Sequence, residues 1–141
     1  MKDIKNILKK QILTLDGAMG SLIQTHSLSE LDYRGEILSD HPQDLKGNHD
    51  ILSLTRPDII HSIHSLYLEA GADIIETNTF NANAISQSDY GLEHLVYQLN
   101  LESAKIAKNV TRAVTNKNPE KPRYVAGILG PTNRTCSMSP K

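Results

Sequence analysis

The sequence predicts an α/β fold in which parallel strands alternate with helices. Three runs of β-branched and other apolar residues, at 11–15, 72–77 and 124–129, each end in a short cluster of glycine or polar residues. Amphipathic helical patterns cover 55–71 and 92–114, which places a helix before each of the last two strands. Strands separated by helices of this length pair in parallel through right-handed crossovers, so the expected order is strand, helix, strand, helix, strand.

The N-terminal segment is expected to combine a short helix with the first strand. Ile4, Ile7 and Leu8 recur at helical spacing with lysines on the other side, and we expect this helix to pack under the domain rather than to lie on a membrane. Residues 11–15 form a compact β-compatible run, after which Asp16 would stand at the carboxyl end of the strand.

The first long helix has clear signals at both ends. Thr55 is expected to cap it, Pro57 fits its first turn, and Gly71 ends it. The preceding stretch, 27–48, is polar and has no sustained period, so it is expected to be a long loop. One stripe of the helix collects its apolar residues, which are Ile59, Ile60, Ile63, Leu66 and Tyr67.

The arrangement of strand ends favours a barrel over an open sheet. The three expected strands end in Asp16-Gly17, in residues 77–79 and in residues 130–132, and in a barrel these ends would meet at the catalytic face. The first of these turns lacks the three-glycine fingerprint of a dinucleotide-binding sheet. We therefore expect a partial (β/α) barrel of TIM type that comprises the first three strands and their helices.

Composition excludes several classes of protein. The chain has 141 residues, with 15 Lys plus Arg against 16 Asp plus Glu, so a net charge of −1 argues against a nucleic-acid partner. No apolar run approaches the length of a membrane span, and no membrane partner is expected. The single cysteine and the lack of a secretory signal pattern favour a reducing, cytoplasmic setting.

Four motifs make the pattern specific. They are LDGAMG (15–20), DLKGN (44–48), GADIIETNTFN (71–81) and VAGILGPTNRT (125–135). Together they resemble the amino-terminal region of cobalamin-dependent methionine synthases, and the resemblance extends from about residue 12 to residue 140. Residues 1–141 are accordingly expected to form the N-terminal portion of a homocysteine-binding (homocysteine S-methyltransferase) barrel domain.

The resemblance implies a chemistry. In the complete family enzyme, an eight-stranded barrel holds zinc through three cysteine thiolates, and zinc lowers the thiol pKa of homocysteine so that its thiolate attacks the methyl group of methylcobalamin to give methionine. Only three strands and one cysteine, Cys136, are present here. We expect this chain alone to bind neither zinc nor cobalamin and to be inactive in methyl transfer, because the remaining strands and the folate and cobalamin modules are missing.

The resemblance also suggests which residues meet the substrate, homocysteine. Asp16 could accept a hydrogen bond from its ammonium group, with the amides of Gly17, Ala18, Met19 and Gly20 near its carboxylate. At the other two strand ends we expect pocket residues Glu76, Asn78, Thr79, Phe80, Gly130 and Pro131. The structural alternatives are a simple strand-ending turn at Asp16, a hydrogen-bond network between loops at 76–80, and a chain turn at 130–131. No residue is assigned a catalytic or metal-binding role.

Other candidate groups are expected to be structural. His61 and His64 have a spacing that can place two imidazoles on one metal, but they lie beside the apolar stripe, so we expect both to be solvated. His26, His41, His49 and His94 have no partner spacing, and Cys136 is expected to be a small buried or loop residue rather than a nucleophile.

Two other functions are alternatives to homocysteine binding. The chain could be a non-catalytic binding or assembly piece that needs a complementary chain carrying the later strands. It could also be a barrel enzyme of lyase or aldolase type, but no lysine stands at any of the three strand ends, which argues against Schiff-base chemistry.

Overall fold

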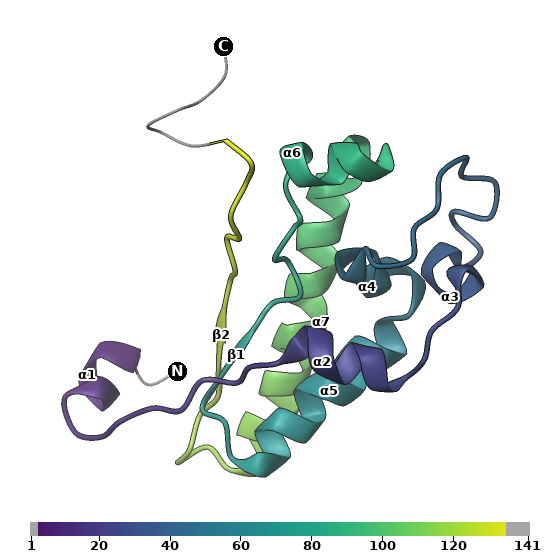
Figure 1. Cartoon of the computed structure of the whole chain (residues 1–141). Coiled ribbons are helices and arrows are strands. Elements are labelled where there is room, and N and C mark those ends of the chain that lie inside the picture. The colour runs from purple at the N-terminus through teal and green to yellow at the C-terminus, as the bar shows by residue number, and fades with distance from the viewer. Residues whose placement is uncertain (1–2, 135–141) are drawn as a thin grey trace.

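A computed structural model describes residues 3–134, and these residues form a small α/β unit in which helices pack on a short parallel sheet (Figure 1). The sheet has the order β1-β2, with β1 at Ile74–Glu76 and β2 at Tyr124–Ala126. The two strands are parallel, with Ile75 opposite Val125, which confirms the predicted crossover topology for the second and third expected strands.

The prediction of a strand at 11–15 is wrong. That segment contacts the sheet through an isolated bridge between Leu15 and Ile74. The reason lies in Asp73, whose carboxylate accepts hydrogen bonds from the backbone N–H of Thr14 at 3.0 Å and from the Thr14 hydroxyl at 3.1 Å. The Thr14 carbonyl still accepts the N–H of Ile74 at 3.1 Å, and the Asp16 N–H donates to the Ile74 carbonyl at 3.0 Å, so the segment runs parallel to β1 around Leu15 only. Ile12, just before it, is 92% exposed.

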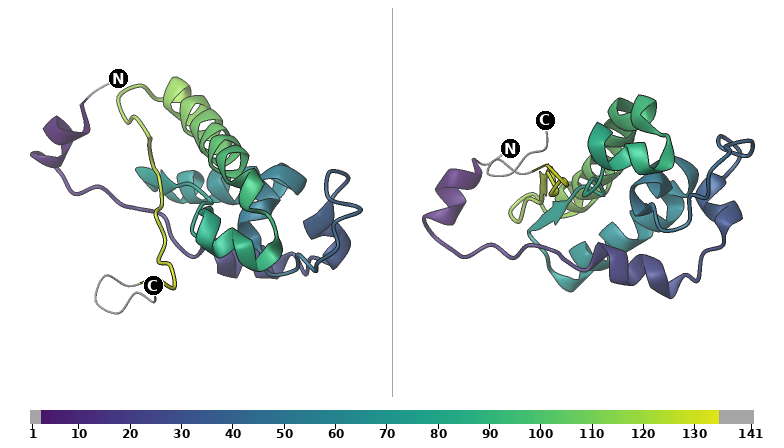
Figure 2. Two further views of the ribbon diagram at one scale, coloured as in Figure 1. Left: turned by 90° about the horizontal axis from the view of Figure 1, so that it is seen from above. Right: turned by 45° about the horizontal axis from the view of Figure 1, so that its top comes forward.

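The helices and turns lie in the following order along the chain: α1 (Ile4–Leu8), α2 (Met19–Thr25), α3 (Glu30–Arg34), η1 (His49–Ile51), α4 (Leu52–Thr55), α5 (Pro57–Ala70), α6 (Ala84–Gln87), η2 (Ser88–Tyr90), η3 (Glu93–Leu95) and α7 (Val96–Lys117). The two long helices, α5 and α7, pack against each other and lie on the same side of the two strands (Figures 1 and 2). Both correspond to the amphipathic segments found in the sequence.

The start of α5 differs from the prediction. Thr55 is the last residue of α4, and the N-cap of α5 is Arg56. The Arg56 guanidinium donates to Asp58 in the first turn of α5 and to Asp32 on α3, which ties two helices together at this corner. At the other end Gly71 has φ 111°, a left-handed conformation that glycine adopts without strain, and it ends the helix as predicted.

The predicted loop at 27–48 contains the short helix α3. Ser29 caps it through a reciprocal capping box, in which the Ser29 hydroxyl accepts from the Asp32 N–H and the Asp32 carboxylate accepts from the Ser29 N–H. The Ser-x-x-Asp spacing was present in the sequence and could have indicated this helix. Glu30 on α3 then accepts the backbone N–H groups of Leu45 and Lys46, which holds the rest of the loop in place.

Helix α1 does not pack under the domain as expected. None of its residues is buried, Leu8 is 55% exposed, and Figure 1 shows the helix standing apart from the body of the molecule. Its three apolar side chains offer too little surface to offset the loss of chain freedom that docking would require.

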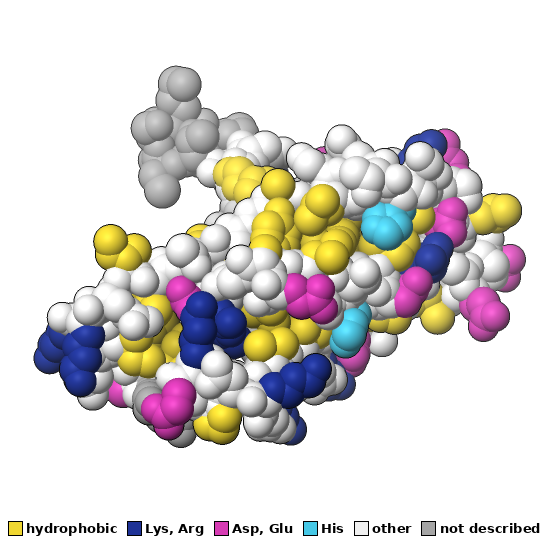
Figure 3. Space-filling view, turned by 90° about the horizontal axis from the view of Figure 1, so that it is seen from below, with side chains coloured by type: hydrophobic (Ala, Val, Ile, Leu, Met, Phe, Trp, Pro, Cys, Tyr) yellow, Lys and Arg dark blue, Asp and Glu magenta, His cyan; other side chains and the backbone are white. Residues whose placement is uncertain are grey.

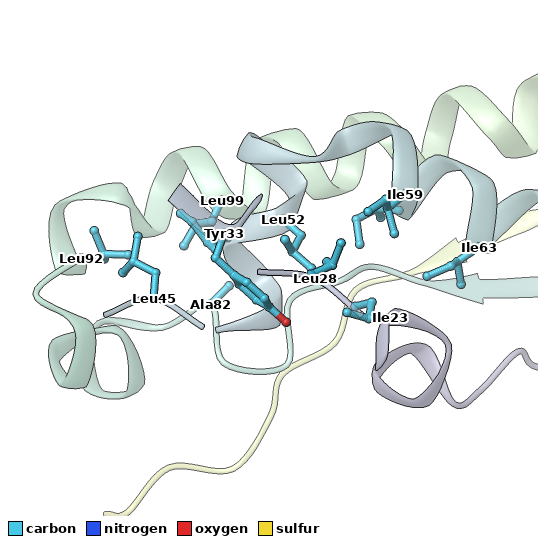
Figure 4. Packing of buried hydrophobic residues seen from close by; sticks show 12 residues of the cluster. Ile23, Leu28, Tyr33, Leu45, Leu52, Ile59, Ile63, Ala82, Leu92 and Leu99 are labelled. Atoms are coloured by element: carbon cyan, nitrogen blue, oxygen red, sulfur yellow. The ribbon is translucent and has the colours of Figure 1, made fainter. Parts of the chain in front are cut away.

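The core lies between the helices and the strands. Its larger cluster joins α5 and α7 to the 28–52 region (Figure 4), and a second cluster around Ile75 packs the sheet against Leu68, Ala107 and Val110. Hydrophobic side chains also remain exposed, including Leu129 at 99%, and Figure 3 shows others between interspersed acidic and basic groups. No helix of residues 3–134 has both the length and the apolar character needed to span a bilayer.

The prediction that His64 is solvated is wrong. His61 is exposed as predicted, but His64 is fully buried and neither of its ring nitrogens has a hydrogen-bond partner among the described residues. Helix α5 is contacted by α2, α4, α7 and β1, so more than its apolar stripe is covered. Burial, with a smaller contribution from nearby His61, lowers the pKa of His64 to about 4.

Replacing Leu99 tests the core. Leu99→Ala empties a position on α7 that has no exposed surface, and we expect it to lower the free energy of unfolding by about 2–5 kcal/mol in urea denaturation. Leu101→Ala, on the same helix but at a side chain that is 38% exposed, should cost much less. Equal losses in the two variants would contradict the packing described for α7.

Replacing His64 tests the buried imidazole through pH. The folded pKa of about 4 lies below the unfolded value of about 6.5, so between these pH values the unfolded state binds more protons and wild-type stability rises with pH. We expect His64→Leu to be more stable than wild type, with the advantage largest near pH 4.5 and smallest near pH 7. Denaturation across this range measures it, with His61→Gln as the control; a pH-independent difference would contradict the assignment.

Candidate functional site

A cavity of about 330 Å³ opens at the carboxyl ends of the two strands. It is walled by the 16–20 turn, by the 47–50 segment and by the chain that follows β1. Most of the residues predicted for the site meet here, although they come from separate parts of the sequence. They are Asp16, Gly17, Ala18, Met19, Gly20, Glu76, Asn78, Thr79 and Phe80.

Asp16 is fixed to the strand that ends at Glu76. Both carboxylate oxygens of Asp16 accept the backbone N–H of Glu76, at 3.0 and 3.1 Å, and its own N–H donates to the carbonyl of Ile74. Burial raises the pKa of Asp16 to about 6, and the neighbouring Glu76 carboxylate adds to the rise while the N–H bond opposes it. Two carboxyl groups therefore share one wall of the cavity, which favours a cationic ligand there.

A run of free backbone donors follows Asp16. The amides of Gly17, Ala18, Met19 and Gly20 donate to no acceptor among the described residues, since Met19 begins α2 and the first N–H groups of a helix lack partners within it. Ala18 adopts a left-handed conformation with φ 46° and ψ 32°, which is uncommon for a residue other than glycine. The turn thus presents several unpaired N–H groups beside a pair of carboxyl groups.

The segment after β1 is held by an internal hydrogen-bond network. The Asn78 side-chain amide donates to the carbonyl of His49 at 2.9 Å and to the Ser53 hydroxyl at 3.2 Å. The Thr79 hydroxyl lies 2.7 Å from that of Thr77 and donates to the carbonyl of Ile128 at 3.0 Å. These contacts show that the structural alternative considered for 76–80, a network between loops, exists here, and it fixes the floor of the cavity.

Sequence reasoning did not assign several wall residues, among them His49 and Asp50. Asp50 is buried, and its carboxylate accepts the N–H of Asn81 at 2.9 Å. Burial raises the pKa of Asp50 to about 6 and lowers that of His49, which stacks on Tyr33 with ring centroids 6.1 Å apart. These residues directly follow the 44–48 motif, so extending that motif by two positions would have found them.

Gly130 and Pro131 are not among the residues that wall the cavity. Gly130 instead lies directly against the backbone of Phe80, where any Cβ atom would overlap the Phe80 carbonyl oxygen. Gly130 therefore lets the chain after β2 approach Phe80, which is itself one of the residues lining the cavity.

No metal-binding residue was predicted in the sequence, but the resemblance to homocysteine S-methyltransferases raises the question of whether these residues could hold zinc. Residues 3–134 contain no group of three or more His, Cys, Asp or Glu side chains placed to hold a metal ion. Cys136, the single cysteine of the sequence, lies outside the described residues. The described residues therefore do not fit a three-thiolate zinc centre, and no chemical step through zinc can be assigned to them.

Comparison with known families identifies the class. The sequence model of the homocysteine S-methyltransferase family matches residues 13–141, which is most of the chain. The chain belongs to the homocysteine S-methyltransferase family. In (β/α) barrel enzymes the active site likewise lies at the carboxyl ends of the strands.

Solved structures support the same fold. The chain is similar to the homocysteine methyltransferase MmuM from Escherichia coli in its metallated form (24% identity, TM-score 0.68) and its oxidized form (25%, 0.69). It is also similar to the apo form (23%, 0.62). The matches cover 91%, 91% and 94% of this chain but only 41%, 40% and 42% of those chains, so it spans about two fifths of their length.

A pair of glycines on the same segment tests the support behind the cavity. Gly130→Ala forces the chain away from Phe80, and we expect a loss of about 1–3 kcal/mol in the free energy of unfolding. Gly127→Ala is the matched control, because no atom outside its neighbours lies within 4 Å of the added Cβ. Urea denaturation measures both; a Gly130→Ala protein as stable as the control would show that the two segments do not touch.

Proposed function

We propose that this chain provides the amino-acid end of a homocysteine-binding pocket. The observation that carries the proposal is the pairing of the Asp16 and Glu76 carboxyl groups with the free N–H groups of 17–20 in one cavity. An α-amino acid carries an ammonium and a carboxylate on the same carbon, and these two kinds of protein group are their natural partners.

The roles follow from charge. The ammonium group would donate to Asp16, with Glu76 adding negative potential, while the carboxylate would accept from the amides of the 17–20 turn. Gly17 leaves open space around its Cα, and the exposed ring of Phe80 would cover the aliphatic part of the ligand. Gly130 and Pro131 would act indirectly, by holding the Phe80 segment.

In the complete barrel, this pocket would position homocysteine for methylation to methionine. The chain would supply the first part of a partial barrel, and the sulfur end would be served by residues beyond those described. The further assignment to a methionine synthase, with methylcobalamin as donor and zinc as thiol activator, rests on the resemblance of the four sequence motifs. We expect this chain alone to bind the amino-acid end without transferring a methyl group.

A second candidate is a binding or assembly piece completed by another chain. It is favoured by the exposure of Leu129 at 99% and by the fact that β2 has a strand partner, β1, on one edge in the described residues. Unpaired strand edges readily accept further strands. Co-expression with a polypeptide carrying the later strands of the family barrel tests this: a stable complex supports it, and two separately eluting species contradict it.

Recognition of the ammonium group is tested by a two-ligand titration. We expect Asp16→Asn to weaken homocysteine binding by about 10-fold or more, because a charge-assisted hydrogen bond is lost. The same change should leave 4-mercaptobutanoate, which lacks the amino group, bound as before. Isothermal titration calorimetry at pH 7 under reducing conditions measures all four combinations.

Asp44→Asn is the matched control, since the Asp44 side chain is 94% exposed and does not wall the cavity. Equal losses for the two ligands in the Asp16 variant, or no binding of homocysteine by the wild-type chain at millimolar concentration, would contradict the proposal.

The affinity should also depend on pH. With the pKa of Asp16 raised to about 6, its carboxyl group is largely protonated at pH 5 and ionised at pH 7. The ligand ammonium stays charged throughout this range, so we expect homocysteine to bind more tightly as pH rises from 5 to 7. Calorimetry at pH 5, 6 and 7 checks this, and the dependence should be smaller in Asp16→Asn. Tighter binding at pH 5 would contradict the assigned role.

A further inference from the structure

A second concave site lies at the other end of the sheet, away from the homocysteine cavity. A groove of about 550 Å³ is formed by the last turns of α7 and the chain that returns to β2. Arg123, which lines the groove, comes directly before β2. Ile128, which lines the homocysteine cavity, comes after β2, so the two sites lie at opposite ends of this strand. The groove therefore has no residue in common with the site described above.

The groove concentrates positive charge. Lys108, Arg112 and Arg123 line it, together with Thr115 and Asn116, and no Asp or Glu belongs to its lining. This contrasts with the chain as a whole, in which acidic residues slightly outnumber basic ones. A groove lined by cations and hydrogen-bond donors, with no carboxylate, favours an anion.

Lys108 and Arg112 repel each other on α7, and an anion bound between them would reduce this repulsion. Lys108 and Arg112 are one turn apart on α7, a spacing at which like charges destabilise a helix. Neither forms an ion pair with a carboxylate among the described residues. Lys105, one turn earlier on the same helix, pairs with Glu102 at 2.8 Å, so the helix offers such partners elsewhere.

Arg123 supplies an independent observation. Its side chain is only 10% exposed, and Nη1 donates to the carbonyl of Gly71 at 3.0 Å and approaches the Asp73 carboxylate at 3.3 Å. Its Nε–H is buried and has no acceptor among the described residues. A buried donor without a partner is rare in native structures, and a bound anion or water is one way to satisfy it.

Neutral donors complete the lining. The Thr115 hydroxyl oxygen accepts the backbone N–H of Arg123 at 2.9 Å, which leaves its O–H hydrogen available to an acceptor in the groove. The Asn116 side-chain amide supplies a second neutral donor on the same stretch of helix. The combination of cationic and neutral donors suits a ligand with several acceptor oxygens.

We propose that this groove binds a small phosphate-type oxyanion, either free phosphate or the phosphate group of a monoester. Such a group carries nearly two negative charges at neutral pH and three or more acceptor oxygens, which matches the lining better than a carboxylate with one charge and two oxygens. Lys108 and Arg112 supply the charge from the helix, and Arg123, whose Nη1 is already bonded to Asp73, offers its unpartnered Nε–H at the wall.

The test is a titration of the ¹⁵N-labelled chain with inorganic phosphate at constant ionic strength, with sodium chloride as the balancing salt. We expect saturable amide shifts confined to the 108–123 segment, with a millimolar dissociation constant. Shifts that do not saturate, or that chloride reproduces, would show charge screening only and would overturn the proposal. A parallel titration with glycerol 2-phosphate distinguishes the sources: tighter binding indicates a monoester, and weaker binding indicates free phosphate.

Variants separate the groove from general surface charge. Arg112→Gln removes an exposed cation and is expected to weaken phosphate binding at least fivefold. Lys105→Gln, on the same helix but outside the groove, should have no effect. Equal weakening by both, or no weakening by Arg112→Gln and Lys108→Gln together, would overturn the site. Homocysteine titrations of the same variants serve as an internal check, because the two cavities share no residue and that affinity should not change.

Discussion

The fold depends on one buried carboxylate at the amino ends of the strands. Asp73 accepts hydrogen bonds from the N–H and hydroxyl of Thr14, and it lies 3.3 Å from Nη1 of Arg123 and 3.5 Å from Nζ of Lys121. It thereby joins the N-terminal segment, β1 and the start of β2. Although burial alone would raise its pKa, the Thr14 hydrogen bonds and the Lys121 charge hold that pKa below its usual range. The ionised Asp73 therefore holds three distant segments together at the amino ends of the strands.

At the carboxyl ends of the strands, the carboxyl groups lack, within the described part of the chain, the cationic partners that Asp73 has. There Asp16 has an N–H partner, Glu76, but no cationic partner among residues 3–134, and the pKa values of Asp16 and Asp50 both rise to about 6 through burial. A carboxyl group kept away from protein cations is available to a ligand cation, whereas Asp73 is already neutralised by the protein. The contrast between Asp73 and Asp16 explains why Asp73 serves the fold, whereas Asp16 is available to the amino-acid ligand that we propose.

Much of the site could be predicted because its residues follow strand ends, and parallel strands bring their carboxyl ends to one edge. The 76–80 segment follows β1, and the 16–20 turn follows the parallel bridge between Leu15 and Ile74, so the two meet at that edge. The prediction failed where a residue's role depends on a contact that leaves no local signature. Gly130 contacts Phe80 instead of lining the cavity, and the Thr14 N–H donates to the Asp73 carboxylate where a longer strand ladder was expected.

By itself, the sequence determined the family, the alternation of strand and helix, and the two long helices, because hydrophobic period and end signals act within a few residues. Only the tertiary structure decided that His64 is buried, that α1 stands free, and that His49 and Asp50 join the site. Each of these depends on which surfaces distant segments cover. Burial is a property of the packed chain, and no local pattern along α5 records that α2 packs against it.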